Sequence, residues 1–208
     1  MRYNLTELIA QGEGTRLEFK STIHTAYRIA RTLTAFSNTS GGLLIVGVTD
    51  DGRVSGVESE LHEMQKIEKA TDFLIDPAIS ISYEVVQQAG RQVLLIDVPE
   101  SDEKPHYAID ERGNRTIYVR AKDKSIPTNR LMLTSSSLPD SQLLQSTNVR
   151  NLIQVLRKTD FITAKQYAQL VNISEYRANK LLQQLTEQGL LIMVDKPRPV
   201  RFSLKITE

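Results

Sequence analysis

The sequence predicts an α+β protein of two domains, a mixed sheet covered by helices followed by a smaller domain of helices and a hairpin. Its 208 residues slightly exceed the usual size of one domain, about 100–200 residues. A polar segment with a proline, Thr134 to Gln142, has the composition of a linker. Strand-like patterns prevail before this segment, and helical spacing of apolar residues prevails after it. We therefore expect domains at 1–133 and 147–208, joined by a linker at 134–146.

Composition and charge exclude several classes of protein. Hydrophobic residues make up 40% and charged residues 25% of the chain, which is ordinary for a soluble globular protein. The chain has no Cys, which excludes disulfides and thiolate metal sites. No apolar run reaches the roughly 18–20 residues that a membrane helix needs, and none follows the start as a signal peptide requires. We expect a cytoplasmic protein with no membrane partner.

The N-terminal part carries alternating strand and helix signals. Helices are expected at 23–37 and 59–74, the first because its apolar residues recur at spacings of three and four. Gly41 and Gly42 end the first helix and would allow close approach of other backbone. The expected strands are Arg16 to Lys20, Leu43 to Val48, Ile79 to Val86, Val93 to Val98 and Thr116 to Arg120. Few connections are long enough for parallel crossovers, so we expect a mixed sheet.

The C-terminal part has clearer signals. An apolar stripe from Val149 to Leu156 predicts a first helix, and Thr163 with Gln166 forms a capping box that starts a second one. Ser174 can cap a third helix whose predicted buried stripe is Ala178, Leu181, Leu182 and Leu185. Strands are expected at Leu190 to Val194 and at Val200 to Leu204. Three helices followed by a hairpin are the arrangement of a winged helix-turn-helix.

The third helix and the hairpin are the candidate nucleic-acid-binding elements. Residues 148–208 carry 10 Lys and Arg against 5 Asp and Glu, a net +5, whereas the rest of the chain carries −4. The exposed positions of the third helix would include Arg177, Asn179, Lys180 and Gln183. Arg pairs well with guanine, and Asn or Gln pairs well with adenine, through two hydrogen bonds each. Lys196, Arg198 and Arg201 of the hairpin suit phosphates. We expect this domain to bind double-stranded DNA, and the alternative is a winged helix used for dimerisation or protein contacts.

Two sets of motifs resemble known families. Gln188-Gly189-Leu190-Leu191, after the third helix, resembles winged-helix transcription regulators. The N-terminal part contains Glu18-Phe19-Lys20, Ala35-Phe36-Ser37-Asn38-Thr39-Ser40-Gly41-Gly42, Gly47-Val48-Thr49-Asp50-Asp51-Gly52, Lys104-Pro105-His106 and Ile117-Tyr118-Val119-Arg120. With these motifs, residues from about 10 to 130 resemble the Schlafen/AlbA-type domain, described as a DNA-binding domain of bacterial transcription regulators. The two resemblances together imply a DNA-binding transcriptional regulator that needs no cofactor.

A metal-dependent ribonuclease is the alternative function. In the Schlafen ribonucleases three acidic residues serve RNA cleavage, and the resemblance carries those roles to Glu13, Glu18 and Asp50. Clustered carboxylates can hold Mg²⁺ or Mn²⁺ and activate water beside a phosphate, and Lys20 could contact that phosphate. The chain departs from those enzymes because it has one copy of the domain and no zinc-binding Cys. In the purely structural interpretation Glu18 pairs with Lys20 or Arg16.

Two further expectations concern surfaces. Arg120, Lys122 and Lys124, at the end of a strand, either extend a nucleic-acid surface or belong to a solvated loop. A helix-turn-helix that reads a palindrome usually works as a dimer, so we expect a homodimer formed through the N-terminal sheet. A third class of function is a scaffold in which both domains contact only proteins.

Overall fold

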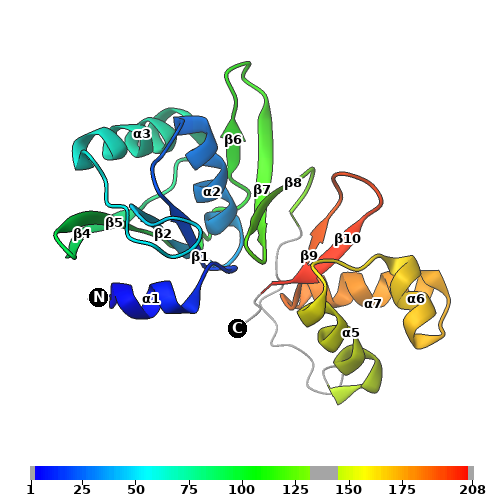
Figure 1. The fold of residues 1–208 in the computed structure, drawn as a ribbon. Helices are drawn as coiled ribbons and strands as arrows, with labels where there is room; N and C mark the ends of the chain where they lie inside the picture. Colours follow the sequence, from blue (N-terminus) through cyan, green and yellow to red (C-terminus); the bar gives the residue numbers. More distant parts are fainter. Residues whose placement is uncertain (1–2, 132–144, 206–208) are drawn as a thin grey trace.

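The computed structural model describes residues 3–131, the N-terminal region, and residues 145–205, the C-terminal region (Figure 1). The elements of the N-terminal region are α1 (Leu5–Gln11), β1 (Leu17–Lys20), α2 (Ala26–Asn38), β2 (Gly42–Val46), α3 (Glu60–Phe73), β3 (Ile75–Asp76), β4 (Ser82–Gln88), β5 (Arg91–Val98), β6 (Tyr107–Ile109), β7 (Arg115–Ala121) and β8 (Lys124–Thr128). Those of the C-terminal region are α5 (Thr147–Lys158), α6 (Ala164–Val171), α7 (Glu175–Glu187), β9 (Leu191–Val194) and β10 (Arg201–Leu204). The expected linker at 134–146 lies almost wholly outside the described residues.

The first sheet is mixed, as the sequence predicts. Its order is β1-β2-β5-β4, with β1 parallel to β2 and the other pairs antiparallel. Side chains of β2 alternate between faces, so that Leu43 and Ile45 join one hydrophobic cluster while Leu44 and Val46 join another. Helix α1 contributes to the first cluster, and α2 and α3 contribute to the second. Burial on both faces explains why β2 is an uninterrupted apolar run.

A second sheet, β3-β6-β7-β8, is antiparallel throughout. The sequence predicts β7 but neither of its neighbours, β6 and β8, so this sheet was not expected. Helix α2 packs against β6 and β7, and its Leu33 and Phe36 also belong to the cluster that includes the first sheet. The two sheets are thus joined through α2 (Figure 1).

The segment that ends α2 ties these layers together. The Asn38 side-chain amide donates to the carbonyls of His106 and Tyr118 at 2.9 and 3.0 Å, and its oxygen accepts from the His106 N–H at 2.8 Å. Gly41 has φ of +66°, and a Cβ there would lie 2.8 Å from the Glu100 nitrogen. The close backbone approach predicted at this glycine is confirmed, because any larger residue would clash with backbone.

The C-terminal region contains the helices and the hairpin at the positions that the sequence indicates. The capping box is present, with the Gln166 N–H donating to the Thr163 hydroxyl at 3.2 Å and the Thr163 N–H donating to the Gln166 side chain at 2.8 Å. Asn172 adopts a left-handed conformation with φ of 53° and makes the turn between α6 and α7. Strands β9 and β10 pair antiparallel, and a separate core forms under them from α5, α6 and α7.

The hairpin also contacts the N-terminal region, so both faces of β9 are buried. Leu191 and Met193 pack into the helical core, whereas Ile192 and Val194 cluster with Val119 of β7. Polar contacts add to this interface, since Asp195 accepts hydrogen bonds from the Thr128 hydroxyl at 2.8 Å and the Asn129 N–H at 2.7 Å. Figure 1 shows β8 beside β9 at this junction. The direction of the hairpin is therefore set by the N-terminal region.

Within residues 3–131 and 145–205, no helix combines the length and the apolar character needed to cross a membrane.

Candidate functional site

Helix α7 presents a polar face to solvent, as the sequence analysis expected. The Ser174 hydroxyl caps the helix by accepting the Arg177 N–H at 3.3 Å. Arg177, Lys180 and Gln183 are exposed and Asn179 is half-buried. The buried residues of the helix are Ala178, Leu182, Leu185 and Thr186, and Leu181 of the predicted stripe is half-buried against the same core. The helix therefore holds three of its four candidate side chains free of the core, within its first three turns.

The hairpin turn carries two further exposed cations, Lys196 and Arg198. Arg201 differs from them because it is half-buried, with its guanidinium carbon 4.6 Å from the centre of the Phe161 ring. It also donates a long hydrogen bond, 3.5 Å, to the Lys196 carbonyl. Arg201 thus braces the hairpin against Phe161, whereas Lys196 and Arg198 project from the turn.

An open groove of about 510 Å³ brings α6, α7 and the hairpin onto one surface. Thr163 and Lys165 line it from the start of α6, Tyr176 and Asn179 from α7, and Pro199 from the hairpin. Tyr176 is 78% exposed, which is unusual for a large aromatic side chain and leaves its ring available for contact. The first turns of α7 and the hairpin turn therefore border the same groove.

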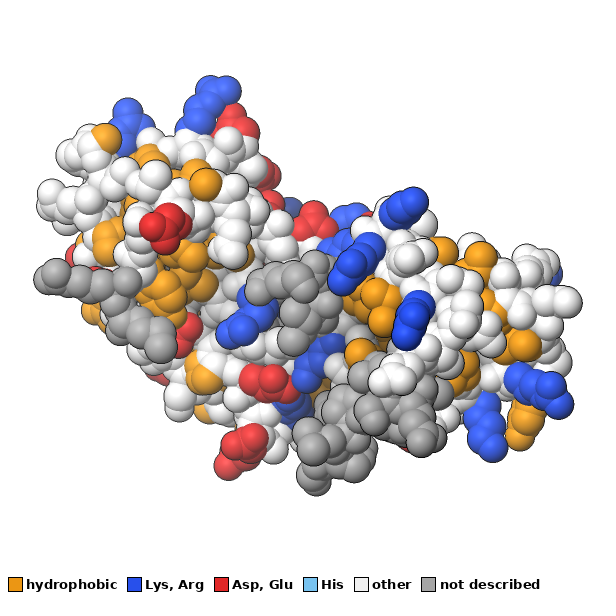
Figure 2. Space-filling model, turned by 90° about the horizontal axis from the view of Figure 1, so that it is seen from below, with side chains coloured by type: hydrophobic (Ala, Val, Ile, Leu, Met, Phe, Trp, Pro, Cys, Tyr) orange, Lys and Arg blue, Asp and Glu red, His pale blue; other side chains and the backbone are white. Residues whose placement is uncertain are grey.

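Two acidic residues of the C-terminal region are paired at its junction with the N-terminal region, whereas Glu175 lines the groove together with Lys165. Figure 2 views the molecule from below Figure 1, and the charged side chains over the C-terminal region are there mostly Lys and Arg. Asp160 is turned toward the N-terminal region, where it lies 3.0 Å from the Nζ atoms of both Lys122 and Lys124. Asp195 likewise contacts Arg130, at 3.8 Å. These two acids are neutralised at the junction of the regions, away from α7.

Lys122 and Lys124 are consequently paired with Asp160 at the junction, and the Lys124 side chain remains 57% exposed. Their hydrogen bonds to Asp160 lower the pKa of its carboxyl group below the ordinary value.

Glu18, one of the three acidic residues of the nuclease alternative, is buried and engaged by cations. Its Oε1 lies 3.0 Å from Lys20 Nζ and accepts the Thr32 hydroxyl at 3.2 Å. Its Oε2 is hydrogen-bonded to the guanidinium of Arg120. The pairing with Lys20 that the structural interpretation expects is confirmed.

Arg120 is completely buried, so both alternatives expected for it, a nucleic-acid surface and a solvated loop, were wrong. Besides Glu18, its guanidinium donates to the carbonyls of Gly14 at 2.8 Å and Thr15 at 3.3 Å, and it lies 4.7 Å from the centre of the Phe36 ring. Burial lowers the pKa of Arg120, and the charge of Glu18 opposes that effect. Arg120 therefore links β7 of the second sheet to β1 of the first.

Glu13 and Asp50 lie near this pair without completing a metal site. Glu13 accepts the Phe19 N–H at 2.8 Å and is 4.0 Å from Lys20 Nζ. Burial raises the pKa of Glu13, and the negative charges of Glu18 and Asp50 raise it further. The three acids thus interact electrostatically, but among the described residues no three His, Cys, Asp or Glu are arranged to hold a metal ion. Arg120, Lys20 and Thr32 already occupy the Glu18 oxygens, so these residues do not fit a divalent cation.

Comparison with known proteins places these features in a family. No curated protein matches the chain. Among solved structures, the N-terminal domain of a Nitrosomonas europaea protein described as related to the ATP-dependent DNA helicase RecG shares 23% identity, with a TM-score of 0.47, over 57% of this chain and 88% of that one. The DIP2311 protein of Corynebacterium diphtheriae shares 18% identity, with a TM-score of 0.43, over 74% of this chain but only 38% of that one. The family model described as Schlafen, AlbA_2 matches residues 13–129. Because this match covers more than half of the chain, the protein belongs to the Schlafen AlbA_2 family.

Proposed function

We propose that this chain is a nucleic-acid-binding protein, that residues 147–208 form a winged helix-turn-helix specific for double-stranded DNA, and that it acts as a transcriptional regulator. The observation that carries the proposal is the exposed polar face of α7 together with the exposed cations Lys196 and Arg198 of the hairpin turn. Other residues of α7 and of the hairpin border one groove. Membership of the AlbA_2 family, which covers the other part of the chain, supports a nucleic-acid partner.

In this proposal the first turns of α7 enter the major groove. Arg177 and Lys180 are exposed there and can donate to guanine, and Gln183 can pair with adenine. Asn179 is half-buried and lines the groove of the protein between α7 and the hairpin, so it lies at the edge of the proposed contact surface. The direct base contacts then rest on three side chains of one helix face.

The hairpin supplies sequence-independent affinity. Lys196 and Arg198 are exposed cations at its turn and suit phosphates on either side of the groove that α7 occupies. Asp195, at the base of the hairpin, is hydrogen-bonded to β8 and the residue after it. This contact holds the hairpin in one direction before DNA binds, which reduces the entropy lost on binding.

We further propose that two copies bind one palindromic site, joined through the N-terminal domain at 1–133. Strand β4 lies at an edge of the first sheet, and its Tyr83 is 52% exposed. An unpaired strand edge can pair with a second copy. This arrangement leaves the α7 surface of each copy free.

The experiment that tests the function is a binding measurement by fluorescence anisotropy with duplex DNA and with single-stranded RNA of the same sequence. A duplex selected from a random library serves as the specific site. Arg177→Ala should weaken binding to it by about 1–3 kcal/mol if the side chain reads a base. Lys69→Ala, which removes an exposed lysine of α3, serves as the control and should leave the affinity unchanged. Equal affinities of Arg177→Ala and wild type, or tighter binding of RNA than of DNA, would contradict the proposal.

A further inference from the structure

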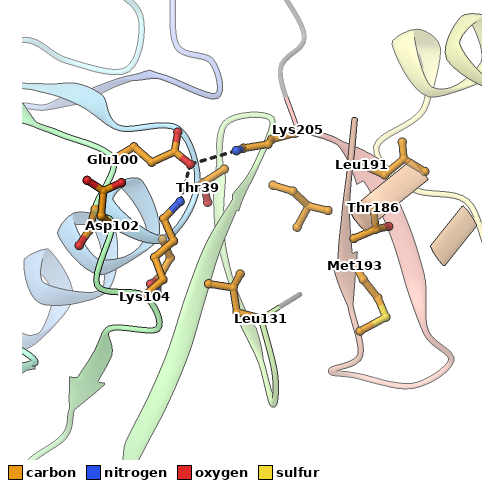
Figure 3. Close-up of a pocket in the computed structure, with 12 residues that line it drawn as sticks. Thr39, Glu100, Asp102, Lys104, Leu131, Thr186, Leu191, Met193 and Lys205 are labelled. Atoms are coloured by element: carbon orange, nitrogen blue, oxygen red, sulfur yellow. Dashed lines mark hydrogen bonds and ion pairs between the residues drawn. The ribbon is translucent and has the colours of Figure 1, made fainter. Parts of the chain in front are cut away.

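A cavity of about 310 Å³ lies where the two regions meet (Figure 3). One wall is polar and includes Thr39 at the end of α2 together with Glu100 and Lys104 of the loop after β5. The opposite wall includes the apolar side chains of Leu131 and of Ile192 from β9, which belong to the cluster shared with the N-terminal region. Its volume is within the range of small-ligand pockets, about 300–1,000 Å³, and such pockets occur preferentially between domains.

The polar wall holds two ammonium groups on one carboxylate. Lys205 Nζ lies 3.0 Å from Glu100 Oε1, and Lys104 Nζ is hydrogen-bonded to the same oxygen (Figure 3). The side chains of Lys104 and Lys205 are only 13% and 17% exposed. This lysine–glutamate triad therefore carries a net charge of +1, with both ammonium groups largely enclosed and the Glu100 side chain 39% exposed. A charge removed from water is costly unless an opposite charge accompanies it.

Among the residues that the structure describes, the triad also has hydrogen-bonding capacity to spare. An ammonium group has three N–H donors, and the bond to Glu100 uses one donor of each lysine. Burial raises the pKa of Glu100, but the hydrogen bonds from the two lysines outweigh it, so the group stays ionised. Asp102, which also borders the cavity, is exposed to solvent at its rim. A second carboxylate beside Glu100 would complete a neutral set of two ammonium groups and two carboxylates.

We propose that this cavity binds a small organic monocarboxylate with an apolar body. The ligand carboxylate accepts hydrogen bonds from Lys104 and Lys205, and the body lies against Leu131 and Ile192. A single negative charge neutralises the triad, whereas an amine would face two ammonium groups. Inorganic phosphate would satisfy the lysines but leave the apolar wall uncovered.

The occupant would contact both regions of the chain, because β9 belongs to the hairpin and Glu100 belongs to the N-terminal region. A ligand that binds this junction would stabilise the position of the hairpin. Any resulting change in DNA affinity rests on the proposed function, whereas binding of the carboxylate does not depend on it.

The test is isothermal titration calorimetry on the full chain without nucleic acid, with butanoate, hexanoate and benzoate as probes. At least one of them should bind saturably, whereas hexylammonium, hexan-1-ol and inorganic phosphate should not. Lys104→Met and Lys205→Met should each weaken binding by about tenfold or more. Lys69→Met, which removes an exposed lysine on α3, should bind as wild type does.

Glu100→Gln provides a variant with the opposite expectation. It raises the triad to a net charge of +2 at nearly constant shape and should tighten carboxylate binding, which damage to the fold could not do. Absence of binding by all three carboxylates, equal binding by hexylammonium, or equal weakening in Lys69→Met would overturn the proposal. Because no nucleic acid is present, this failure is distinct from a failure of the proposed DNA binding.

Discussion

Replacing Glu18 by glutamine should destabilise the fold strongly, because Arg120 would remain buried without its charged partner. Arg120 is 0% exposed and Glu18 is 6% exposed. The substitution preserves the size of the side chain and can preserve the hydrogen bond that Glu18 accepts from Thr32. What it removes is the negative charge between Arg120 and Lys20.

The magnitude follows from what Arg120 retains. Removing one partner of a buried ion pair costs about 3–5 kcal/mol. Arg120 keeps its hydrogen bonds to Gly14, Thr15 and Ser125 and its position over the Phe36 ring. We therefore expect the lower end of this range, a loss of about 3 kcal/mol in the free energy of unfolding. For a chain of this size that loss lowers Tm by roughly 6–12 °C.

The assay is urea unfolding of wild type, Glu18→Gln, Arg120→Met and the double variant, which form a double-mutant cycle. The double variant should be less destabilised than the sum of the single variants, since it leaves no unpaired buried charge. Glu13→Gln is the matched control, because Glu13 is half-buried and lies 4.0 Å from Lys20 Nζ without contacting Arg120. It should lower the free energy of unfolding by about 1 kcal/mol. A Glu18→Gln effect no larger than that of Glu13→Gln would refute the structural role assigned to Glu18.

Three other expectations follow from the same structure. Burial raises the pKa of Asp195, but the hydrogen bonds from Asn129 and Thr128 outweigh it and leave the pKa below the ordinary 3.8. The contact therefore stabilises the folded state above about pH 4 and is lost as the pH falls below it, so unfolding free energies measured from about pH 5 to pH 2 should decline less steeply in Asp195→Asn than in wild type. Purified protein with Mn²⁺ should not cleave structured RNA, since Arg120 and Lys20 occupy Glu18; cleavage that Glu18→Ala abolishes without unfolding the chain would promote the ribonuclease alternative. Light scattering at high micromolar concentration should give the mass of a dimer, and a strictly monomeric mass would contradict the proposed joining of two copies.

The elements that the sequence predicts are those with strong local signals. Helix α2 and the capped helices α6 and α7 follow from apolar spacing and from Thr163 and Ser174. Strands β3 and β6 have two and three residues, and they exist because Ala108 pairs with Ile75 on one side and Thr116 on the other. Strands this short cannot show the alternation of apolar and polar residues that marks a strand in the sequence, because they form only through pairing with distant segments. Helix α1 was also missed, although Asn4, which accepts the Thr6 N–H at 3.1 Å, was a usable capping signal.

Single side chains with distant partners were harder to interpret. The sequence alone suggests that Arg120 is a surface cation. A buried arginine needs an anionic partner, and its partner Glu18 is 102 residues away in the chain, so no local pattern reveals the pair. Exposure along α7 was predictable because helical spacing separates Arg177 and Lys180 from the buried stripe. The burial of Ile192 and Val194 could not be predicted in this way. A hairpin that packs on three helices needs only one buried face, and its second face is buried here by the N-terminal region.

The salt dependence of binding to duplex DNA tests the central claim most directly, that α7 and the hairpin form a DNA-binding surface. The measurement compares wild type with the double variant Lys196→Gln/Arg198→Gln by anisotropy between about 50 and 200 mM salt. Both side chains are exposed, so the fold should be unaffected. Wild type should lose affinity steeply with salt, and the slope of log affinity against log salt should fall by about 0.9 for each lost phosphate contact. An unchanged slope, or no binding by wild type at the lowest salt, would contradict the account.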